Sequence, residues 1–442
     1  MKAIIMAGGK GSRIQSVESS VPKPMIRING KPILQQQIEG LKNSGITDIT
    51  LVTGYLGHFI NEYFGNGSAF GVHISYYNET VPLGTAGALF KIPGLTQDFL
   101  LLCGDTIFDI DFKRFIAFHK AHGGLATLMS HPNSHPYDSS LLVTQTVYPD
   151  LTLPQGERTG EMPVNTCRVV KWLNKEDERL WYANRVNAGI EIISPELLAL
   201  SKGNGHPTDD GSGTKYDLDR DILKPAVASG RIFAYDTTEY IKDMGTPDRY
   251  YQVEKDLQNG LVASRNLARK QKAFFLDRDG TINKSAGFLT DIDDMELLPG
   301  AAKAIQLINN SGYLAVLVTN QPQIARGELT FEELDEIHKK LETLLGREGA
   351  YLDALYFCPH HPDKGFAGER GEYKTECSCR KPAPGMLLKA AEDYNIDLAA
   401  SYMIGDSARD EQAGIKAGCK KSVRLADGKS LYDTVCKLLK EQ

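Results

Sequence analysis

The chain alternates between two hydrophobic periods along most of its length. Helical spacing of apolar residues recurs at 32–42 and 248–257. Short apolar runs typical of β-strands occupy residues 3–6, 49–53, 72–77, 99–103, 274–276, 313–318, 352–357 and 402–404. Strands that alternate with helices predict an α/β fold.

The length predicts more than one domain, because 442 residues exceed the span of about 100 to 200 residues that one domain usually takes. A short basic stretch at 260–271 looks like a connector. We therefore predict domains at 1–255 and 272–442, joined by a linker at 256–271. Residues 131–166 contain several prolines and no clear period, and we expect an irregular excursion there.

Composition and charge exclude several classes of protein. The 50 basic and 56 acidic residues give a net charge of −6, which argues against a nucleic-acid partner. No apolar run approaches the roughly 18 residues of a membrane span, and the apolar start is too short for a secretory signal. Seven cysteines fit no secreted disulfide framework in so long a chain, so we expect a cytoplasmic protein with reduced thiols.

Two carboxylates stand where one predicted strand ends. Asp277 and Asp279 follow the apolar run 274–276 and precede Gly280, which can bend the chain so that both converge on one point. One carboxylate can attack a phosphate ester while the other transfers a proton. A calcium-type loop or a polar turn would also fit this short pattern taken alone.

Three further motifs follow in order: Thr319-Asn320 after a strand, Arg380-Lys381-Pro382, and Gly405-Asp406-Ser407. With them, residues 272–430 resemble the haloacid dehalogenase (HAD) phosphatase superfamily, whose domain is a doubly wound α/β fold. The resemblance implies that Asp277 is the nucleophile and Asp279 the general acid/base, and that the phosphate contacts are Thr319 and Lys381. It also implies a Mg²⁺ site formed by Asp406, the Asp277 carboxylate and the Asp279 carbonyl. Asp410 could support this site or could simply favour a helix N-terminus.

A glycine-rich turn follows the first strand of the chain, with glycines at Gly8, Gly9 and Gly11. Backbone N–H groups of such a turn can bind a polyphosphate, and Arg13 and Lys23 can supply charge for a leaving pyrophosphate. The spacing matches neither the dinucleotide-binding pattern nor a P-loop. Glycine also serves tight turns for conformational reasons alone.

Further motifs at 82–87 (Pro-Leu-Gly-Thr-Ala-Gly) and 104–105 (Gly-Asp) make residues 1–255 resemble the sugar-1-phosphate nucleotidyltransferases. The resemblance implies a Rossmann-like domain with a mixed sheet and a Mg²⁺ held by Asp105 and Asp243. It places the nucleotide near the first glycine turn and at Gly84, Thr85, Gly87 and Gly104.

The same resemblance places the sugar phosphate at Lys175, Asn187 and Gly189. The surroundings of Lys175 depart from the family pattern, since Asn174 and Glu176 replace the usual Glu and Pro, so Lys175 could be an ordinary surface lysine. Gly189 could equally be a bulge in a core strand.

A paired-ligand pattern lies within the second half of the chain. Cys358-Pro359-His360 and Cys377-Ser378-Cys379 offer three thiolates and one imidazole, which can close a tetrahedral zinc site with no position left for water. We therefore expect a structural Zn²⁺, with His361 as the competing imidazole. Such a loop before Arg380 marks a HAD subgroup that includes heptose bisphosphate and histidinol phosphatases, and Arg380 would reach the non-reacting end of the substrate.

Together the resemblances imply a bifunctional enzyme with Mg²⁺ in both sites. One domain would remove the 7-phosphate of D-glycero-D-manno-heptose 1,7-bisphosphate, and the other would couple heptose 1-phosphate to a nucleoside triphosphate. The segment 16–25 looks closest to heptose 1-phosphate guanylyltransferases, which favours GTP. One alternative pairs a hexose-1-phosphate nucleotidyltransferase with a histidinol-phosphatase-like domain, and another makes one domain a binding or regulatory module. The sequence leaves homo-oligomerisation open.

Overall fold

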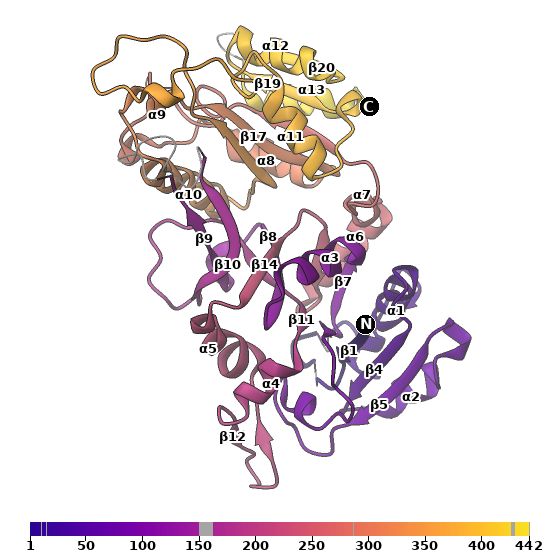
Figure 1. Ribbon diagram of the computed structural model, residues 1–442. Coiled ribbons are helices and arrows are strands. Elements are labelled where there is room, and N and C mark those ends of the chain that lie inside the picture. The colour runs from indigo at the N-terminus through magenta and orange to yellow at the C-terminus, as the bar shows by residue number, and fades with distance from the viewer. Residues whose placement is uncertain (10, 15, 150–161, 286, 426–428, 442) are drawn as a thin grey trace.

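The computed structural model describes residues 1–442 except for 10, 15, 150–161, 286, 426–428 and 442. Two α/β domains follow one another along the chain, and the carboxy-terminal domain lies at one end of the molecule (Figure 1). No helix among the described residues is both long and apolar enough to cross a membrane.

The amino-terminal domain is built on a nine-stranded sheet with the order β5-β4-β1-β6-β11-β8-β14-β10-β9. The first four strands in this order are parallel to one another, whereas β11 is antiparallel to both of its neighbours, so the sheet is mixed as predicted. Its strands are β1 (Lys2–Met6), β4 (Asp48–Thr53), β5 (His73–Asn78), β6 (Phe99–Cys103), β8 (Ala126–His131), β9 (Leu141–Val147), β10 (Val164–Leu173), β11 (Val186–Ile193) and β14 (Ile232–Asp236).

Both faces of this sheet are covered, because its central strands are apolar on both sides. Ala3 and Ile5 face one buried cluster, and Ile4 between them faces another. Helices on the two faces are α1 (Ile33–Asn43), α2 (Gly57–Phe64), α3 (Phe112–His122), α4 (Pro195–Ser201), α5 (Lys224–Ala226) and a π-helical turn at Leu218–Leu223. Short pairs complete the domain: β2 (Arg27–Ile28) with β3 (Lys31–Pro32), β7 (Thr106–Asp109) with β15 (Tyr240–Asp243), and β12 (His206–Pro207) with β13 (Thr214–Lys215).

The carboxy-terminal domain has a five-stranded parallel sheet with the order β18-β17-β16-β19-β20. Separate apolar clusters fill its two faces, which makes it doubly wound. The strands are β16 (Lys272–Leu276), β17 (Tyr313–Asn320), β18 (Ala354–Cys358), β19 (Tyr402–Gly405) and β20 (Lys421–Arg424). The helices are α8 (Ala301–Asn309), α9 (Gln323–Arg326), α10 (Phe331–Arg347), α11 (Gly385–Asp393), α12 (Ala408–Ala417) and α13 (Leu431–Lys440).

The predicted excursion at 131–166 is confirmed at 132–140, where the structure has only the 3₁₀ turn Pro136–Asp138, and is wrong at 141–147 and 164–166. Strands β9 and β10 pair there as an antiparallel hairpin whose register shifts twice, between Asn165 and Val169 and again before Lys171. Such irregularities break the two-residue alternation on which strand prediction depends. The rest of that expectation, 150–161, falls outside the described residues.

The segment predicted as a linker, 256–271, is helical in its first half, which holds the end of α6 (Pro247–Gln258) and the whole of α7 (Leu261–Ser264). Its side chains bind both domains: Arg265 forms a buried ion pair with Asp353 at 2.7 Å, and Asn266 donates to Asp109 at 2.7 Å. The connection therefore helps to fix one domain on the other.

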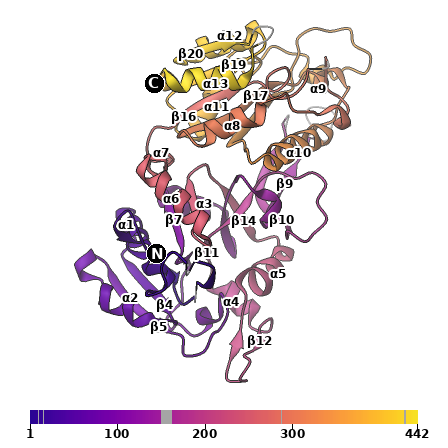
Figure 2. The ribbon, with the colours of Figure 1, turned by 180° about the vertical axis from the view of Figure 1, so that it is seen from behind.

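A second contact between the domains joins the loop after β10 to α10, which lies beside the β9–β10 hairpin in both views (Figures 1 and 2). The backbone N–H groups of Tyr182 and Asn184 donate to Thr343 Oγ1 at 3.0 Å and to Glu342 Oε2 at 2.7 Å. The ring of Trp181 lies close to the cations of Lys340 and Arg347. This contact holds the chain just before β11.

Candidate active sites

The predicted nucleophile Asp277 lies at the carboxyl end of β16, where parallel sheets bind ligands. Its carboxylate accepts a hydrogen bond from Lys381 at 2.7 Å, and the same ammonium reaches Asp410 at 2.6 Å and the carbonyl of Val318 at 2.8 Å. Lys381 and Asp410 are almost fully buried. The structure therefore brings Asp277 and Lys381 together, and it adds Asp410 as the second anion that holds the lysine.

Asp410 combines the two roles that the sequence left open. It occupies the first turn of α12, where its carboxylate accepts from the N–H and the hydroxyl of Ser407 at 2.9 and 2.6 Å. Its other oxygen forms the ion pair with Lys381. The helix N-terminus therefore places the carboxylate that fixes the lysine.

The predicted proton-transfer residue Asp279 is held by three neighbours. Arg278 donates to both carboxylate oxygens at 3.1 and 3.0 Å, Asn283 donates at 3.0 Å and Gln321 at 3.2 Å. Arg278 is itself fully buried and lies 3.3 Å from the imidazole of His338 on α10. None of these partners was predicted, although an arginine between the two aspartates was visible in the motif.

The bend predicted at Gly280 is present, and the structure adds a reason for the glycine. Its φ is +76°, and an added Cβ would lie 2.2 Å from the Asp406 carboxylate. Only glycine therefore lets the chain turn this close to Asp406.

Carboxylate oxygens of Asp277, Asp406 and Asp410 lie within 4.8 Å of one another, a donor set that suits Mg²⁺. Burial raises the pKa of Asp277 to about 6, with further contributions from Asp410 and Asp279 and an opposing one from Lys381. Burial and Asp410 also raise the pKa of Asp406. Thr319 is buried nearby on β17, where its hydroxyl accepts from Gln321 at 2.8 Å.

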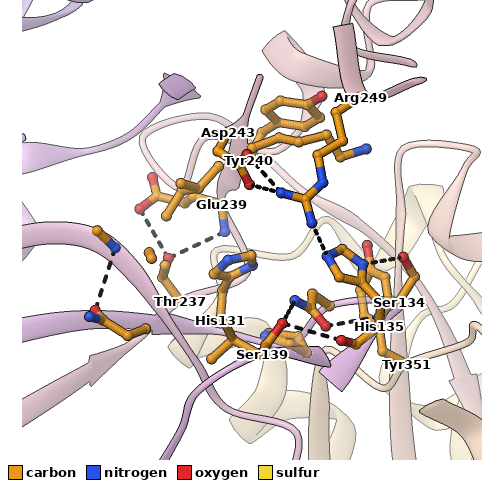
Figure 3. Close-up of a pocket in the computed structure, with 18 of the residues that line it drawn as sticks. His131, Ser134, His135, Ser139, Thr237, Glu239, Tyr240, Asp243, Arg249 and Tyr351 are labelled. Atoms are coloured by element: carbon orange, nitrogen blue, oxygen red, sulfur yellow. Dashed lines mark hydrogen bonds and ion pairs between the residues drawn. The ribbon is translucent and has the colours of Figure 1, made fainter. Parts of the chain in front are cut away.

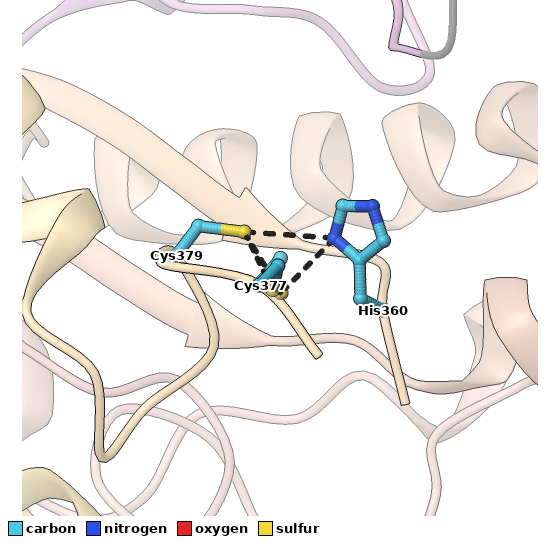
Figure 4. Close-up of side chains that lie close together, drawn as sticks. His360, Cys377 and Cys379 are labelled. Atoms are coloured by element: carbon cyan, nitrogen blue, oxygen red, sulfur yellow. Dashed lines mark hydrogen bonds between the residues drawn. The ribbon is translucent and has the colours of Figure 1, made fainter. Parts of the chain in front are cut away.

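The predicted zinc ligands Cys358, His360, Cys377 and Cys379 form one cluster (Figure 4). The three sulfurs lie 3.1 to 3.5 Å apart, and His360 Nδ1 lies 3.6 Å from two of them. Ligands of a tetrahedral zinc with Zn–S bonds of about 2.3 Å would be about 3.8 Å apart, so the set fits the ion after a small expansion. A hydrogen bond from the Cys358 thiol lowers the pKa of Cys379 to about 4.

His361, the competing imidazole, is not part of the cluster of described ligand atoms. It accepts a hydrogen bond from the Asp363 N–H at 3.2 Å. Arg380 is tied to the same cluster. Its N–H donates to Cys377 Sγ at 3.3 Å and its guanidinium donates to the His360 carbonyl at 2.9 Å. The cluster therefore fixes the residue that precedes Lys381.

In the amino-terminal domain, the pairing of β7 with β15 brings Asp105 and Asp243 together. Asp243 is in register with Thr106, and Met244 N–H donates to the Asp105 carbonyl at 2.9 Å. Each carboxylate is paired with a cation: Lys23 binds Asp105, and Arg249 binds Asp243 with contacts of 2.6 and 2.7 Å. Two oxygen donors from separate strands fit a Mg²⁺ whose remaining ligands are substrate phosphates.

The glycine motifs lie around these carboxylates. Gly11 has a φ of +60° and lies against the side chain of Lys23, whereas Gly84, with a φ of +84°, lies against the Tyr216 backbone. Gly8 lies close to Glu79, Gly104 donates its N–H to the Met6 carbonyl at 2.9 Å, and an added Cβ at Gly9 would meet no atom within 4 Å. The chain is therefore closely packed at these glycines, except at Gly9.

Three more of these residues are placed by their neighbours. The Arg13 guanidinium lies beside Gly245, next to Asp243. The Thr85 hydroxyl accepts from Leu218 N–H at 2.7 Å, and an added Cβ at Gly87 would lie 2.6 Å from Leu83.

A cavity of about 690 Å³, lined by Thr85, Asp243 and Arg249, extends along β11 to the second domain. In Figure 3, Arg249 lies between Asp243 and His135, and its guanidinium is 3.3 Å from the His135 ring. Burial lowers the pKa of the neighbouring His131 to about 4. Arg249 belongs to none of the motifs that the sequence analysis used. Its separation of six residues from Asp243 was the one sequence feature that could have indicated the ion pair between them.

Asn187 and Gly189 line this cavity. Gly189 has a φ of +69° at a bulge in β11. The glycine therefore forms a strand bulge and also lines the cavity, the two interpretations that the sequence left open. Lys175 lies on the rim, half exposed and 3.6 Å from Asp138, which itself lines the cavity.

Residues 2–138 match the nucleotidyl transferase family model, and residues 378–434 match the HAD-hydrolase-like model. The chain is similar to the D-glycero-beta-D-manno-heptose-1,7-bisphosphate 7-phosphatases of Yersinia pestis (44% identical over 163 residues) and Escherichia coli K12 (40% over 165). Each alignment covers 37% of this chain, and 85% and 84% of those proteins. HddC from Yersinia pseudotuberculosis is 24% identical, with a TM-score of 0.44 over 58% of this chain and 99% of that one.

Proposed function

Through its carboxy-terminal domain the chain belongs to the family of D-glycero-beta-D-manno-heptose-1,7-bisphosphate 7-phosphatases, and on that premise we propose that it is a bifunctional enzyme that makes a nucleotide-activated heptose. The carboxy-terminal domain removes the 7-phosphate. The amino-terminal domain then joins heptose 1-phosphate to a nucleotidyl group and releases pyrophosphate. One observation carries this proposal: each domain of the chain has its own complete set of acidic and basic groups. The reaction of the carboxy-terminal domain would yield a sugar 1-phosphate, and the reaction of the amino-terminal domain would consume it.

In the phosphatase reaction, Asp277 attacks phosphorus and forms an aspartyl phosphate, and water then hydrolyses this intermediate. Lys381 neutralises charge on the phosphoryl oxygens, and Thr319 donates to one of them. Asp279 protonates the leaving sugar oxygen and later takes a proton from the attacking water. Mg²⁺ bound by Asp277, Asp406 and the Asp279 carbonyl would supply further charge screening.

The site surroundings support this division of roles between the two aspartates. The Asp277 oxygen beside Lys381 is held in place, which suits a nucleophile that must approach an anion. Asp279 is held by Arg278, Asn283 and Gln321, so its carboxylate has a defined position two residues beyond the nucleophile.

In the transferase reaction, the sugar phosphate attacks the α-phosphorus of a nucleoside triphosphate. Both reactants are anionic, so charge screening is the main requirement. Lys23 and Arg13 would stabilise the departing pyrophosphate, and Asp105 and Asp243 would hold a Mg²⁺ that screens the phosphates. Lys23 and Arg249, which now pair with these carboxylates, would be released to bind phosphate oxygens when the metal takes their place.

We further propose that the nucleotide is GTP, on the resemblance of residues 16–25 to heptose 1-phosphate guanylyltransferases. The zinc at Cys358, His360, Cys377 and Cys379 is structural, because four protein ligands leave no place for a reacting water. We place the enzyme in the cytoplasm, where nucleoside triphosphates are available and thiolate ligands stay reduced.

A mass-spectrometric screen tests the proposal. The full chain with Mg²⁺ is supplied with heptose 1,7-bisphosphate, histidinol phosphate or a hexose 1-phosphate, each with ATP, GTP, CTP, UTP or dTTP. We expect phosphate release from the heptose substrate and a nucleotide sugar with GTP. Faster hydrolysis of histidinol phosphate, together with a nucleotide sugar formed only from a hexose 1-phosphate, would instead support the alternative pair of activities.

A further inference from the structure

Two acidic residues, Glu191 on β11 and Asp219 on the π-helical turn, line the 690 Å³ cavity. Neither has a role in the reaction described above. Glu191 belongs to the same strand as Asn187 and Gly189, just beyond the bulge that opens the strand to the cavity. The pair therefore lies at the sugar side of the proposed transferase site.

Glu191 is 1% exposed, and neither of its carboxylate oxygens has a hydrogen-bond partner among the described residues. A buried carboxyl without partners destabilises a fold by several kcal/mol when it is charged, so such groups are normally paired or neutral. Burial raises the pKa of Glu191 well above its usual range, and Asp219 raises it further, whereas the nearby Asn187 amide opposes the change. The carboxyl therefore has unused capacity both to accept and to donate a hydrogen bond.

Asp219 is the other acid of this segment that remains available. Asp217 already accepts from Arg220 N–H at 2.9 Å and from the Thr85 hydroxyl at 3.3 Å, and Asp221 forms an ion pair with Arg220. No hydrogen bond or ion pair to the Asp219 carboxylate is present within the described part of the chain. π-helical turns are rare and often occur at functional sites, and this one presents Asp219 to the cavity.

We propose that Glu191 and Asp219 bind hydroxyl groups of the sugar in the transferase site and so determine which sugar 1-phosphates are accepted. A hydroxyl can donate to a carboxylate and can accept from a protonated carboxyl, so it satisfies either form. The two acidic side chains would repel an anionic phosphate. The hydroxyl groups of the sugar are therefore the part of a sugar phosphate that can bind here. This inference rests on the proposed transferase activity.

The test compares full-length Glu191→Leu, Glu191→Gln and Asp219→Asn with a matched control, Asp209→Asn. Asp209 lies in the loop between β12 and β13, where its side chain is 96% exposed and forms an ion pair with Lys215. Steady-state rates are measured with GTP and with D-mannose 1-phosphate, heptose 1-phosphate and the singly deoxygenated analogues of mannose 1-phosphate. Thermal unfolding verifies that each variant is folded.

We expect Glu191→Leu and Asp219→Asn to lower kcat/KM for the sugar phosphate by about 10- to 100-fold. This factor corresponds to the loss of one hydrogen bond to a charged group. The KM for GTP should stay unchanged. Glu191→Gln, which keeps one acceptor, should retain more activity. At least one deoxygenated analogue should be a poor substrate for the parent enzyme and should lose that disadvantage in Glu191→Leu. The phosphatase rate and the Asp209→Asn control should equal those of the parent.

Folded variants with parental kcat/KM for every sugar phosphate would overturn the inference. A change in the KM for GTP alone would also overturn it, because the two acids would then bind the nucleotide and not the sugar. If Glu191→Leu does not fold, Asp219→Asn and Glu191→Gln decide by the same criteria. A parent enzyme that transfers a nucleotide to no sugar 1-phosphate would overturn the proposed function as well, so the two failures are distinguishable.

Discussion

Lys381 is the residue whose contacts define the phosphatase site. An ammonium group has three donors, and here Asp277, Asp410 and the Val318 carbonyl accept from all of them. The position of the charge is therefore fixed before any substrate enters. This arrangement is what electrostatic stabilisation of a phosphoryl group requires.

The raised pKa of Asp277 predicts how stability depends on pH. The folded carboxyl has a pKa of about 6, above its ordinary 3.8, so the folded state binds the proton more tightly and the buried charge destabilises the fold as pH rises through this range. We expect Asp277→Asn to raise the melting temperature in Mg²⁺-free buffer at pH 8. The gain corresponds to at most about 3 kcal/mol, which follows from 1.36 kcal/mol per pKa unit.

The gain should shrink between pH 6 and pH 4, because the parent carboxyl is then protonated. The measurement is thermal unfolding of both proteins across this range, with Asp209→Asn as the control. A difference that stays constant with pH would contradict the raised pKa.

At the residue scale, sequence reasoning identified the residues that motifs place at strand ends, such as Asp277, Asp406 and Asp105. It did not identify their partners. Arg278 meets His338 across 60 residues, and Arg249 reaches Asp243 only because α6 begins at Pro247. Such contacts depend on how elements pack, which local patterns do not contain.

Among the elements, α10 links the two domains. One turn of it carries Glu342 and Thr343, which accept from the loop before β11, and the turn before that carries His338, which lies beside Arg278. Gly346 allows the close approach, since an added Cβ would lie 2.6 Å from Pro136 of the other domain. Glycine is thus used inside a helix, where it otherwise costs about 1 kcal/mol relative to alanine.

Gly346→Ala tests this contact. We expect a net loss of up to about 2 kcal/mol, because overpacking costs about 1–3 kcal/mol and the gain in helix propensity offsets about 1 kcal/mol of it. Denaturant unfolding of the full chain measures it.

The control is a double-mutant cycle with Pro136→Ala, which removes the ring atoms that the new Cβ would meet. In that background Gly346→Ala should be neutral or stabilising. Equal losses in both backgrounds would show that Gly346 is not limited by the domain contact.

The cluster of Cys358, His360, Cys377 and Cys379 connects β18 to the segment that begins at Arg380. Zinc ligation can contribute on the order of 10 kcal/mol, so removal of a ligand should loosen residues 358–379 and misplace Lys381. For Cys377→Ser we expect much less bound zinc, and a phosphatase rate lowered about 100-fold, the typical cost of a shift near 1 Å. Nucleotidyl transfer should be unaffected.

Elemental analysis with parallel assays checks this prediction, and Cys436→Ser on the distant helix α13 is the control. A parent protein that contains no zinc, or a zinc-free variant with full phosphatase activity, would refute it.

Periodicity predicted the regular elements within one or two residues, including β1, β4, β6, β17 and α1, because each has a continuous buried stripe. It failed for β9 and β10, where register shifts break the alternation, and it gave no sign of the π-helical turn at Leu218–Leu223. The π-helical turn contributes Leu218 and Asp219 to the cavity, so one of the unpredicted elements helps to shape the candidate site.

At the scale of the whole molecule, Asp277, Thr319 and Lys381 are not among the described residues that line the 690 Å³ cavity. The 690 Å³ cavity meets the carboxy-terminal domain at Asn309, Asn310 and Asp353, which precede β17 and β18. Asp277 and Thr319 lie at the opposite ends of the parallel strands. We therefore expect the sugar 1-phosphate to pass through solvent from one site to the other.

An isotope-dilution experiment tests this path. Labelled heptose 1,7-bisphosphate and GTP are supplied together with a tenfold excess of unlabelled heptose 1-phosphate. We expect the nucleotide sugar formed at early times to carry the label fraction of the mixed pool. Product that keeps most of the label despite the excess would demonstrate direct transfer between the sites.

The central claim, that two separate sites act in sequence, is tested most directly by complementation between Asp277→Asn and Asp105→Ala. Each folded variant alone, given heptose 1,7-bisphosphate and GTP, should form no nucleotide sugar, and the two mixed together should form it at a rate limited by diffusion of heptose 1-phosphate. Asp277→Asn should also make the product when heptose 1-phosphate is supplied, and Asp105→Ala should still release phosphate. A mixture that stays inactive, or a single substitution that abolishes both reactions while the fold is intact, would contradict the account.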